Sequence, residues 1–578
     1  MRDRQASVVA PTVLRSVSDA LRAQLEGEGE RVHVRAGEWL FRAGEPADRA
    51  YLVRSGRLEV VVEQPREVVI RQLKRGAVVG ELALLSYGQR SASVRARRDS
   101  ELAELSRERL ETLMRDAPEF GLALVRAMAA QIAANQVPEA VSSRPRTVAV
   151  VPLDAGAPAA AVSAELKVAL SGYGRADLLG PDPDCDRQAF AERLERAESA
   201  NRRVLLTGGS ADPLEPWTDF CLAEADLVLA VTSGEPARVW RGHAASLRGC
   251  ELLVLGGAPA PADALIASLG PREVHVMRDE RARANGLAQL ARRLVGRAIG
   301  LVMSGGGARA LAHLGVLDEL EACGIVVDRL AGASMGAIVS GLAASRASTA
   351  EVAEVLQHTL IDSNPSNDYM LPAYSLIRGA KTRRALEWAF GDRRIEEQPK
   401  RWFCVSSDLL SRELVVHRTG LMVDAIYPSM AIPGIYPPLP ARGDRLLVDG
   451  GVIDNLPVEP MARRAEGPVI AVDVSLRDGN VTSTGRPRLE PVKRRFRHIM
   501  TGSERPVPRL SETILRTIAL GSTDTVAAAM QHADLVISPQ VDGVGLLDWK
   551  QLPRAREIGR QAARTALESA LDELQALA

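Results

Sequence analysis

The chain carries no net charge, few cysteines and no CxxC pair. Lys+Arg 73 balance Asp+Glu 73 over 578 residues, so no overall field attracts nucleic acid or anionic lipid, and any such contact has to be local. The five cysteines stand singly and are odd in number, which fits a reducing cytosol and argues against structural zinc.

The sequence also lacks an export signal and a membrane span. The N-terminal stretch MRDRQASVVAPTVLRSV has no continuous apolar core after its positive residues. Residues 330–345 form the longest uncharged candidate, but they are too few and too rich in Gly, Ala and Ser to cross a bilayer. We therefore expect a cytoplasmic protein whose contact with a membrane, where it occurs, is peripheral.

The first predicted domain is a small all-β barrel or jelly roll. The chain is too long for one hydrophobic core, and about three or four domains are expected. From 31 to 105, short β-rich pieces separated by glycines have the spacing of such a barrel. Helical patterns follow at 107–116 and 118–134, and the second has apolar residues close to every fourth position, which predicts a packed face.

Inside the predicted barrel lies GELALLSYGQRSASV, residues 80–94. This stretch resembles the phosphate-binding cassette of the cyclic-nucleotide-binding domain family, and the resemblance extends over roughly the first 135 residues. The resemblance implies cAMP or cGMP as a regulatory ligand. The candidate nucleotide-binding residues are Gly80, Glu81, Leu82, Ala83, Arg90 and Ser91.

The residue types in this cassette suit a cyclic phosphate. A tight turn at Gly80 exposes backbone N–H groups at the start of a short helix, where anions bind readily. Arg90 can donate a fork of hydrogen bonds to the phosphate, Ser91 adds a hydroxyl, and Glu81 suits the ribose 2′-hydroxyl. The alternative is an empty barrel in which Glu81 and Arg90 pair with each other. A transcription factor of this barrel type needs a helix-turn-helix, but the strand TVAVVPL follows, so no nucleic-acid partner is expected.

The middle of the chain is predicted to be an α/β domain with a parallel, doubly wound sheet. A Pro/Ser/Arg-containing stretch at 138–146 marks a linker, after which strand-like runs alternate with helical runs. Gly208 and Gly209 follow a strand, but no dinucleotide or P-loop fingerprint accompanies them. We expect a Rossmann-like coupling domain without a ligand site of its own.

From residue 297 the pattern begins again with a strand, a triple-glycine turn and an amphipathic helix. Gly305, Gly306 and Gly307 do not form a P-loop, because Ala308 and Arg309 stand where Lys-Ser/Thr is required. A glycine turn that leads into a helix presents bare N–H groups to a developing negative charge, as an oxyanion hole requires. Arg309, in the first turn of that helix, either fixes the loop or attracts an anionic substrate.

A second turn places one hydroxyl among very small residues. The stretch from Gly332 to Gly336 reads G-x-S-x-G around Ser334, and the strand-like IVVDRLAG before it supplies the strand-turn-helix context of a nucleophile elbow. Alternatively, the small residues only let a helix pack closely against a neighbour. Farther on, RLLVDGG puts Asp449 at the end of an apolar strand, where a carboxylate is well placed to act as a base.

Together, GGGARA, GASMG, DGG and SMAIPGIYPP resemble the patatin-like phospholipase family. With the barrel and the α/β segment, the chain resembles the soluble part of a neuropathy target esterase-type lysophospholipase, but with a single barrel and no N-terminal membrane anchor. The resemblance implies Ser334 as nucleophile, Asp449 as general base, and an oxyanion hole at 305–308. It also implies phospholipid or lysophospholipid acyl esters as substrates, with Arg309 as a substrate-binding candidate and neither metal nor cofactor in catalysis.

For this dyad to work, the pKa of Asp449 has to be higher than that of an ordinary aspartate. An ordinary aspartate, with a pKa of roughly 3.9, is a weak base for serine, so burial beside Leu446, Leu447 and Val448 should raise its pKa. A Ser-His-Asp triad with His313 is the natural rival. His313 lies on the helix that follows the glycine turn, and we expect it to pack or to act as a polar cap.

Two basic segments are candidates for contact with lipid. Residues 371–390 mix apolar side chains with Arg378, Lys381, Arg383 and Arg384, as in a segment that rests on a membrane surface. The run RRFRH at 494–498 is expected to be a solvated loop.

The sequence therefore predicts a multidomain protein: an all-β jelly-roll barrel with C-terminal helices (1–137), a linker (138–146), an α/β Rossmann-like coupling domain (147–296) and an α/β patatin-like hydrolase domain (297–578). The predicted function is a serine esterase modulated by a cyclic nucleotide, with no prediction of oligomeric state. The alternatives are a nucleotide-sensing scaffold with a silent hydrolase domain, and a triacylglycerol or general carboxylesterase.

Overall fold

A computed structural model covers the chain. The residues that it describes are 31–34, 38–62, 68–74, 77–81, 83, 88–97, 100–135, 145–200, 203–212, 215–234, 247, 249–256, 265–363, 365, 367–370, 375–441, 443–464, 466–475, 523–545 and 548–570. Leu82, most of the predicted linker and the basic run at 494–498 lie outside these residues.

Contacts between residues divide the chain into two compact units. The first comprises 1–155, 176–229 and 238–247, and the second comprises 156–175, 230–237 and 248–578. This division cuts through the predicted coupling domain, so the boundaries drawn from the sequence remain a prediction.

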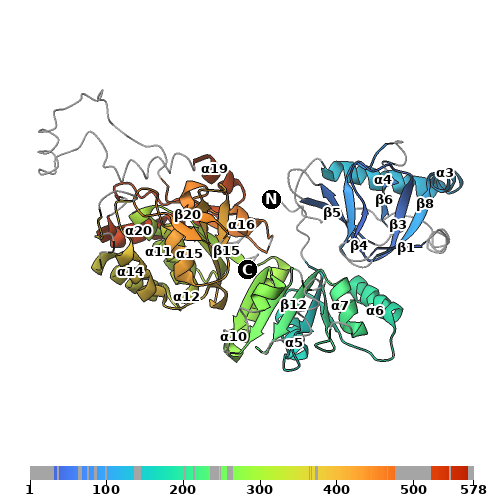
Figure 1. The fold of residues 1–578 in the computed structure, drawn as a ribbon, viewed down its shortest axis with the longest axis horizontal. Coiled ribbons are helices and arrows are strands. Elements are labelled where there is room, and N and C mark those ends of the chain that lie inside the picture. The colour runs from blue at the N-terminus through green and yellow to red at the C-terminus, as the bar shows by residue number, and fades with distance from the viewer. Residues whose placement is uncertain are drawn as a thin grey trace, which may run out of the picture. The chain divides into compact units, whose positions relative to one another are not determined.

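The N-terminal region is the predicted jelly roll, built from two four-stranded sheets (Figure 1). One sheet has the order β1 (Arg31–Val34), β8 (Ser100–Ser106), β3 (Arg49–Ser55), β6 (Val78–Val79), and the other has β2 (Trp39–Phe41), β7 (Ser93–Ala96), β4 (Arg57–Val62), β5 (Val68–Lys74). Helices α3 (Arg107–Asp116) and α4 (Pro118–Asn135) follow where the sequence predicts them, and Phe120 and Leu124 of α4 are buried.

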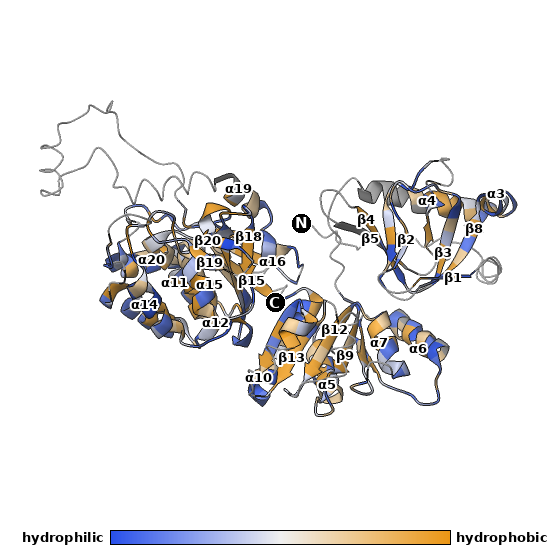
Figure 2. Ribbon diagram, in the orientation of Figure 1, coloured by the Kyte–Doolittle hydropathy of each residue, from blue (hydrophilic) through white to orange (hydrophobic). Residues whose placement is uncertain are grey.

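The middle sheet has six strands in the order β10 (Ala176–Leu179), β11 (Arg203–Thr207), β9 (Thr147–Pro152), β12 (Leu227–Thr232), β13 (Glu251–Leu255), β14 (Glu273–Met277). The ladders β10–β11, β11–β9 and β13–β14 are parallel, in agreement with the predicted α/β class. Its helices are α5 (Ala159–Ser171), α6 (Arg187–Ala200), α7 (Pro216–Glu224) and α10 (Glu280–Val295). Strands β9, β12 and β13 are largely apolar, as their orange colour in Figure 2 shows, because a parallel sheet is covered on both faces.

The C-terminal sheet has the order β19 (Leu439–Ala441), β20 (Arg445–Asp449), β17 (Arg401–Asp408), β16 (Val327–Ala333), β15 (Ile299–Met303), β21 (Val469–Val472), β22 (Leu535–Ile537), and β18 (Leu414–His417) also pairs with β17. The ladders from β17 through β22 are parallel, whereas β18 and β20 run antiparallel to β17, and β19 runs antiparallel to β20. This mixed sheet confirms the α/β class predicted for the hydrolase region.

Alternate strand residues of this sheet face two separate cores, as a period of two requires. Leu301 and Ile470 belong to a core shared with helices α11 (Ala312–Ala322), α12 (Met335–Ser345), α13 (Thr349–Leu356), α14 (Ala380–Phe390), α15 (Met422–Ser429) and α20 (Leu552–Glu568). Val302 and Ala471 belong to a second core with residues of α16 (Glu459–Ala462) and α19 (Thr523–Gln531). Both faces of the sheet are therefore covered.

Within the second unit, a buried guanidinium joins the middle sheet to the hydrolase region. Arg293 of α10 pairs with Glu251 of β13 and with Glu466, just before β21, at 2.8 Å each. All three side chains are almost fully buried, so breaking either pair would leave an uncompensated charge in the interior.

The strand order brings the three predicted motifs to one region. β15 and β16 are parallel neighbours, so the glycine turn after Met303 and the elbow after Ala333 emerge at the same edge of the sheet. β18 fills one side of β17 at residues 404–407, and on the other side β16 pairs up to Val405 and antiparallel β20 continues from Ser406. Asp449, at the end of β20, pairs with Ser406. Among the described residues, no helix is both long and apolar enough to cross a membrane.

Candidate active site

Ser334 stands in a strained turn between β16 and α12. Its φ of 53° and ψ of −125° place a non-glycine residue in a region that L-amino acids rarely adopt. A Cβ on Gly332 would lie 2.4 Å from the carbonyl of Gly336, and one on Gly336 would lie 2.3 Å from Met303 O. The small residues therefore allow both the close backbone packing and the sharp turn at Ser334. Close packing and a nucleophile elbow are thus compatible interpretations of this motif.

The hydroxyl of Ser334 donates directly to a carboxylate. Ser334 Oγ lies 2.7 Å from Asp449 Oδ2, and Asp449 Oδ1 accepts from Gly451 N at 2.8 Å. The backbone N–H of Asp449 donates to Ala431 O at 2.9 Å, which fixes the strand end. Ser334 is 8% exposed and Asp449 is 3% exposed, so the pair lies almost entirely out of water.

This burial raises the pKa of Asp449 to about 7, against the opposing effect of the hydrogen bonds from Ser334 and Gly451. Leu447 and Val448 are buried beside it as predicted, whereas Leu446 is only half-buried. A carboxyl group with such a pKa has a proton affinity suited to general-base chemistry near neutral pH.

His313 takes the structural role expected for it. It is fully buried, and its Nε2 lies 2.9 Å from the carbonyl oxygen of Ser304. Burial lowers the pKa of His313 to about 4, so the imidazole is neutral at pH 7. Because Ser334 reaches Asp449 without an intervening ring, the geometry is that of a dyad rather than a triad.

The glycine turn lies against the serine, but its donors are not equivalent. A Cβ on Gly305 would lie 2.9 Å from Ser334 Cβ, yet the N–H of Gly305 already donates to Asn455 O at 3.2 Å. The 3₁₀ helix that follows spans Gly307–Leu311, and its first paired N–H belongs to Arg309, which donates to Gly306 O. In the described part of the chain, the N–H groups of residues 306–308 have no backbone acceptor. The N–H groups of residues 306–308 therefore remain as candidate oxyanion-hole donors, whereas the N–H of Gly305 is already engaged.

Two further residues, to which the sequence motifs assign no role, hold the turns of the site in place. Asn455 Nδ2 donates to Gly305 O and to Ser475 Oγ, at 3.3 Å each, so its amide fastens the glycine turn. The hydroxyl of Ser429 accepts from Ser334 N at 3.1 Å. Asn455 stands four residues after the DGG motif, and Ser429 is the first residue of SMAIPGIYPP. A polar residue close to each motif was the signal that the sequence offered.

Arg309 has a partner within the protein. Its Nε donates to Val544 O at 2.9 Å, which ties the 3₁₀ helix to the C-terminal segment. This contact supports the loop-fixing alternative, and substrate binding by Arg309 remains a prediction.

The basic segment at 371–390 includes helix α14, and part of its charge is neutralised. Arg383 pairs with Glu387 and Asp424, at 3.0 and 2.8 Å, and Lys381 Nζ donates to Asn367 O. Residues 371–374 lie outside the described residues, so the lipid contact predicted for this segment remains a prediction.

In the barrel, the predicted nucleotide-binding residue Arg90 lies against Gly80. Gly80 has a φ of +83°, Glu81 and Ala83 are buried, and Ser91 is exposed. The guanidinium of Arg90 donates to Arg49 O at 2.7 Å and to Gly80 O at 3.2 Å, while its Nε has no partner in the part of the chain described.

The Arg90 guanidinium also lies 4.0 Å above the ring of Phe41. Burial lowers the pKa of Arg90 from its usual value, although the group stays charged at neutral pH. A buried cation with an open donor is what an anionic ligand requires.

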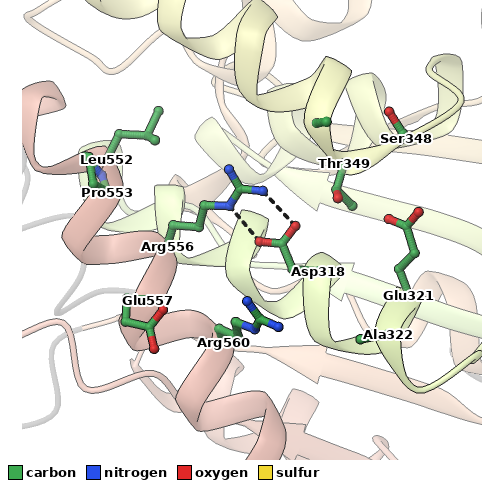
Figure 3. Close-up of a pocket in the computed structure, with 11 residues that line it drawn as sticks. Asp318, Glu321, Ala322, Ser348, Thr349, Leu552, Pro553, Arg556, Glu557 and Arg560 are labelled. Carbon is green, nitrogen blue, oxygen red and sulfur yellow. Dashed lines mark hydrogen bonds and ion pairs between the residues drawn. The ribbon is translucent and has the colours of Figure 1, made fainter.

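A cavity of about 610 Å³ lies elsewhere, between α11, the start of α13 and α20. Figure 3 shows Arg556 donating into this space to Asp318, with bonds of 2.6 and 2.8 Å. Neither Ser334, Asp449 nor a residue of the glycine turn lines it. The cavity is therefore distinct from the dyad.

Comparison with protein families finds two matches. A model described as patatin-like phospholipase matches residues 301–462, and one described as cyclic nucleotide-binding domain matches residues 31–117. The first span contains Ser334, Asp449 and the glycine turn, and the second contains Arg90.

Three relatives show how far the similarity extends. An uncharacterized NTE family protein of Mycobacterium tuberculosis (strain ATCC 25618 / H37Rv) is 34% identical over 97% of this chain and 96% of its own length. Patatin-like phospholipase domain-containing protein 6 of Homo sapiens is 29% identical over 83% of this chain and 40% of its own length. Lysophospholipase nte1 of Aspergillus fumigatus is 27% identical over 97% of this chain and 43% of its own length.

Removing the side-chain amide of Asn455 tests whether it positions the glycine turn. In Asn455→Ala, Gly305 O and Ser475 lose a donor, and the turn is free to shift relative to Ser334. We expect kcat for p-nitrophenyl butyrate to fall about 10- to 100-fold with KM changed less than about threefold, because small misplacements act mainly on the transition state.

Asn285→Ala, at an exposed position of α10, is the matched control and should keep the wild-type kcat. An Asn455→Ala enzyme with unchanged kcat, or with a loss confined to KM, would show that the amide does not position the turn.

Proposed function

The chain belongs to the NTE family of patatin-like phospholipases, and on that premise we propose that it hydrolyses acyl esters of lysophospholipids or phospholipids through Ser334 and Asp449. The observation that carries this proposal is the 2.7 Å hydrogen bond from the serine hydroxyl to a carboxylate whose pKa is raised to about 7. A hydroxyl needs a base at the moment of attack, and this carboxylate is the group in contact with it.

In the proposed first half-reaction, Ser334 Oγ attacks the acyl carbonyl carbon while Asp449 takes the hydroxyl proton. The carbonyl oxygen becomes an oxyanion, which accepts hydrogen bonds from N–H groups of residues 306–308. The C–O bond to the glycerol oxygen then breaks, and that oxygen leaves with the proton held by Asp449. The product on the enzyme is an acyl ester of Ser334.

In the second half-reaction, water attacks the acyl-enzyme and Asp449 accepts a proton from it. Collapse of the second tetrahedral intermediate breaks the bond to Ser334 Oγ, which recovers its proton from Asp449. The fatty acid leaves and the dyad returns to its starting state. No metal or redox group enters these steps.

The names of the relatives support the choice of substrate. The Aspergillus fumigatus relative is named a lysophospholipase, and the human relative carries a patatin-like phospholipase domain. We place lysophospholipids first for this chain, with triacylglycerol and simple esters as the alternative substrates.

Turnover of three substrates tests this proposal: lysophosphatidylcholine, a triacylglycerol and p-nitrophenyl butyrate. We expect Ser334→Ala and Asp449→Asn each to lose at least about a thousandfold in kcat/KM for lysophosphatidylcholine, because nucleophile and base act as a unit. Released fatty acid, measured by mass spectrometry, reports the rate.

Ser345→Ala, at the far end of the helix that follows Ser334, and Asp424→Asn, at an exposed ion pair, are the matched controls and should keep wild-type rates. Equal baselines in wild type and both dyad variants would identify a silent scaffold. Faster turnover of triacylglycerol than of lysophosphatidylcholine would assign a different substrate class.

We also propose that a cyclic nucleotide binds at Arg90 and changes the hydrolysis rate. The matching family model and the buried guanidinium with an open Nε support binding. Regulation further requires that the nucleotide bind two conformations of the protein differently.

Calorimetry with cAMP and cGMP tests the nucleotide site. Arg90→Ala should weaken binding at least about tenfold through loss of charge-assisted hydrogen bonds to phosphate, whereas Arg115→Ala, exposed on α3, should not. The regulatory claim predicts different lysophospholipid turnover with and without saturating nucleotide. Identical rates at verified occupancy would remove that claim, and no binding by the wild type would remove the site.

A further inference from the structure

The turn that joins β17 to β18, residues 408–413, exposes two adjacent leucines. Leu409 is 41% exposed and Leu410 is 63% exposed. Single exposed apolar residues are common on soluble proteins, but neighbouring ones on one tight turn form a small apolar tip.

A buried carboxylate holds this turn in one conformation. Asp408 is 2% exposed and accepts from Leu410 N at 3.1 Å, Ser411 Oγ at 2.8 Å and Leu446 N at 3.0 Å. The N–H of Arg412, which has a φ of +60°, donates to Asp408 O at 2.9 Å. The leucines are thus presented by an ordered support, so little ordering entropy remains to be lost when they bind.

The turn extends beyond the dyad at the same edge of the sheet. In the ladder between β17 and β20, Ser406 is opposite Asp449 and Asp408 is opposite Leu447. On the same side of β17 and one residue earlier, Val405 is level with Ala333, the residue before Ser334. Leu409 is three residues beyond Ser406, which is about 10 Å along an extended strand. A surface that contacts the leucines therefore faces the same edge of the sheet as Ser334.

The charges around the tip balance. The turn at 408–413 carries Asp408, Arg412 and Glu413. The neighbouring connection from β19 into the first residue of β20 carries Arg442, Asp444 and Arg445. Counted from the sequence, the two connections carry three charges of each sign, which gives no net attraction to an anionic surface. Apolar contact by the leucines is the driving force that remains, and it suits a surface of zwitterionic headgroups.

We propose that the β17–β18 turn docks the protein on a zwitterionic phospholipid surface, with Leu409 and Leu410 entering the boundary between headgroups and acyl chains. This inference rests on the proposed lipid substrate, and it names the surface through which the site meets that substrate. It differs from the contact predicted for 371–390, because it uses apolar burial and needs no basic patch.

Flotation of the full chain with phosphatidylcholine vesicles tests the proposal. We expect Leu409→Ser/Leu410→Ser to bind at least tenfold more weakly than wild type, and Leu410→Ser alone to show a smaller loss. Val326→Ser is the matched control, because Val326 is 58% exposed and precedes β16 at the opposite edge of the sheet. It should bind as the wild type does.

Turnover of water-soluble p-nitrophenyl butyrate separates this proposal from the proposed function. Unchanged turnover in all variants shows that the dyad is folded and intact. If the wild type lacks turnover but floats through its leucines, the catalytic proposal fails while the docking surface stands.

Four results would overturn the docking proposal. They are wild-type protein that does not float with phosphatidylcholine vesicles, serine variants that float as well as the wild type, binding only when phosphatidylserine is added, and a dimer that dissociates in the serine variants. The last result, read by light scattering, would assign the leucines to a contact between two copies of the chain.

Discussion

The hydrogen bond between Ser334 Oγ and Asp449 Oδ2 is the contact on which the site depends. It exists because β16 and β20 follow each other along the same side of β17, opposite β18. Ala333 pairs with Val405 and Asp449 pairs with Ser406, so the end of one strand meets the end of the other. Burial of this pair has two effects. It destabilises the charged carboxylate, which raises its proton affinity, and it keeps water from competing for the serine hydroxyl.

The site also requires close contact between backbone segments, and glycines allow this contact at several places. Gly305 and Gly336 let the turn after β15 lie against the serine elbow. Farther out, a Cβ on Gly315 would lie 1.7 Å from Arg556 O, and one on Gly559 would lie 1.8 Å from Ala312 O. Helices α11 and α20 therefore touch backbone to backbone, so the C-terminal helix supports the helix that follows the glycine turn.

The fold class and the pairing of Ser334 with Asp449 could be predicted from the sequence because their signals are local, whereas the catalytic roles of the two residues stay a prediction. A strand, a glycine pattern and one reactive residue lie together around both Ser334 and Asp449, and the family resemblance drawn from these motifs is confirmed by the matching models and relatives. The partner of the Gly305 N–H could not be predicted, because Asn455 lies far along the chain and only the folded strand order brings the two together. For the same reason the bonds of Arg90 to two backbone carbonyls and of Arg309 to Val544 had no sequence signal.

The proposed hydrolysis depends on a desolvated carboxylate as the base for Ser334, and the pH dependence of kcat/KM tests this most directly. Asp449 must be ionised to accept the proton, so activity on an uncharged ester is lost as pH falls through its raised pKa. We predict a half-maximal rate near pH 7 and about a tenfold loss for each pH unit below it. A rate that stays constant down to pH 5 would mean that Asp449 titrates as an ordinary carboxylate or is not the base, and would contradict the account.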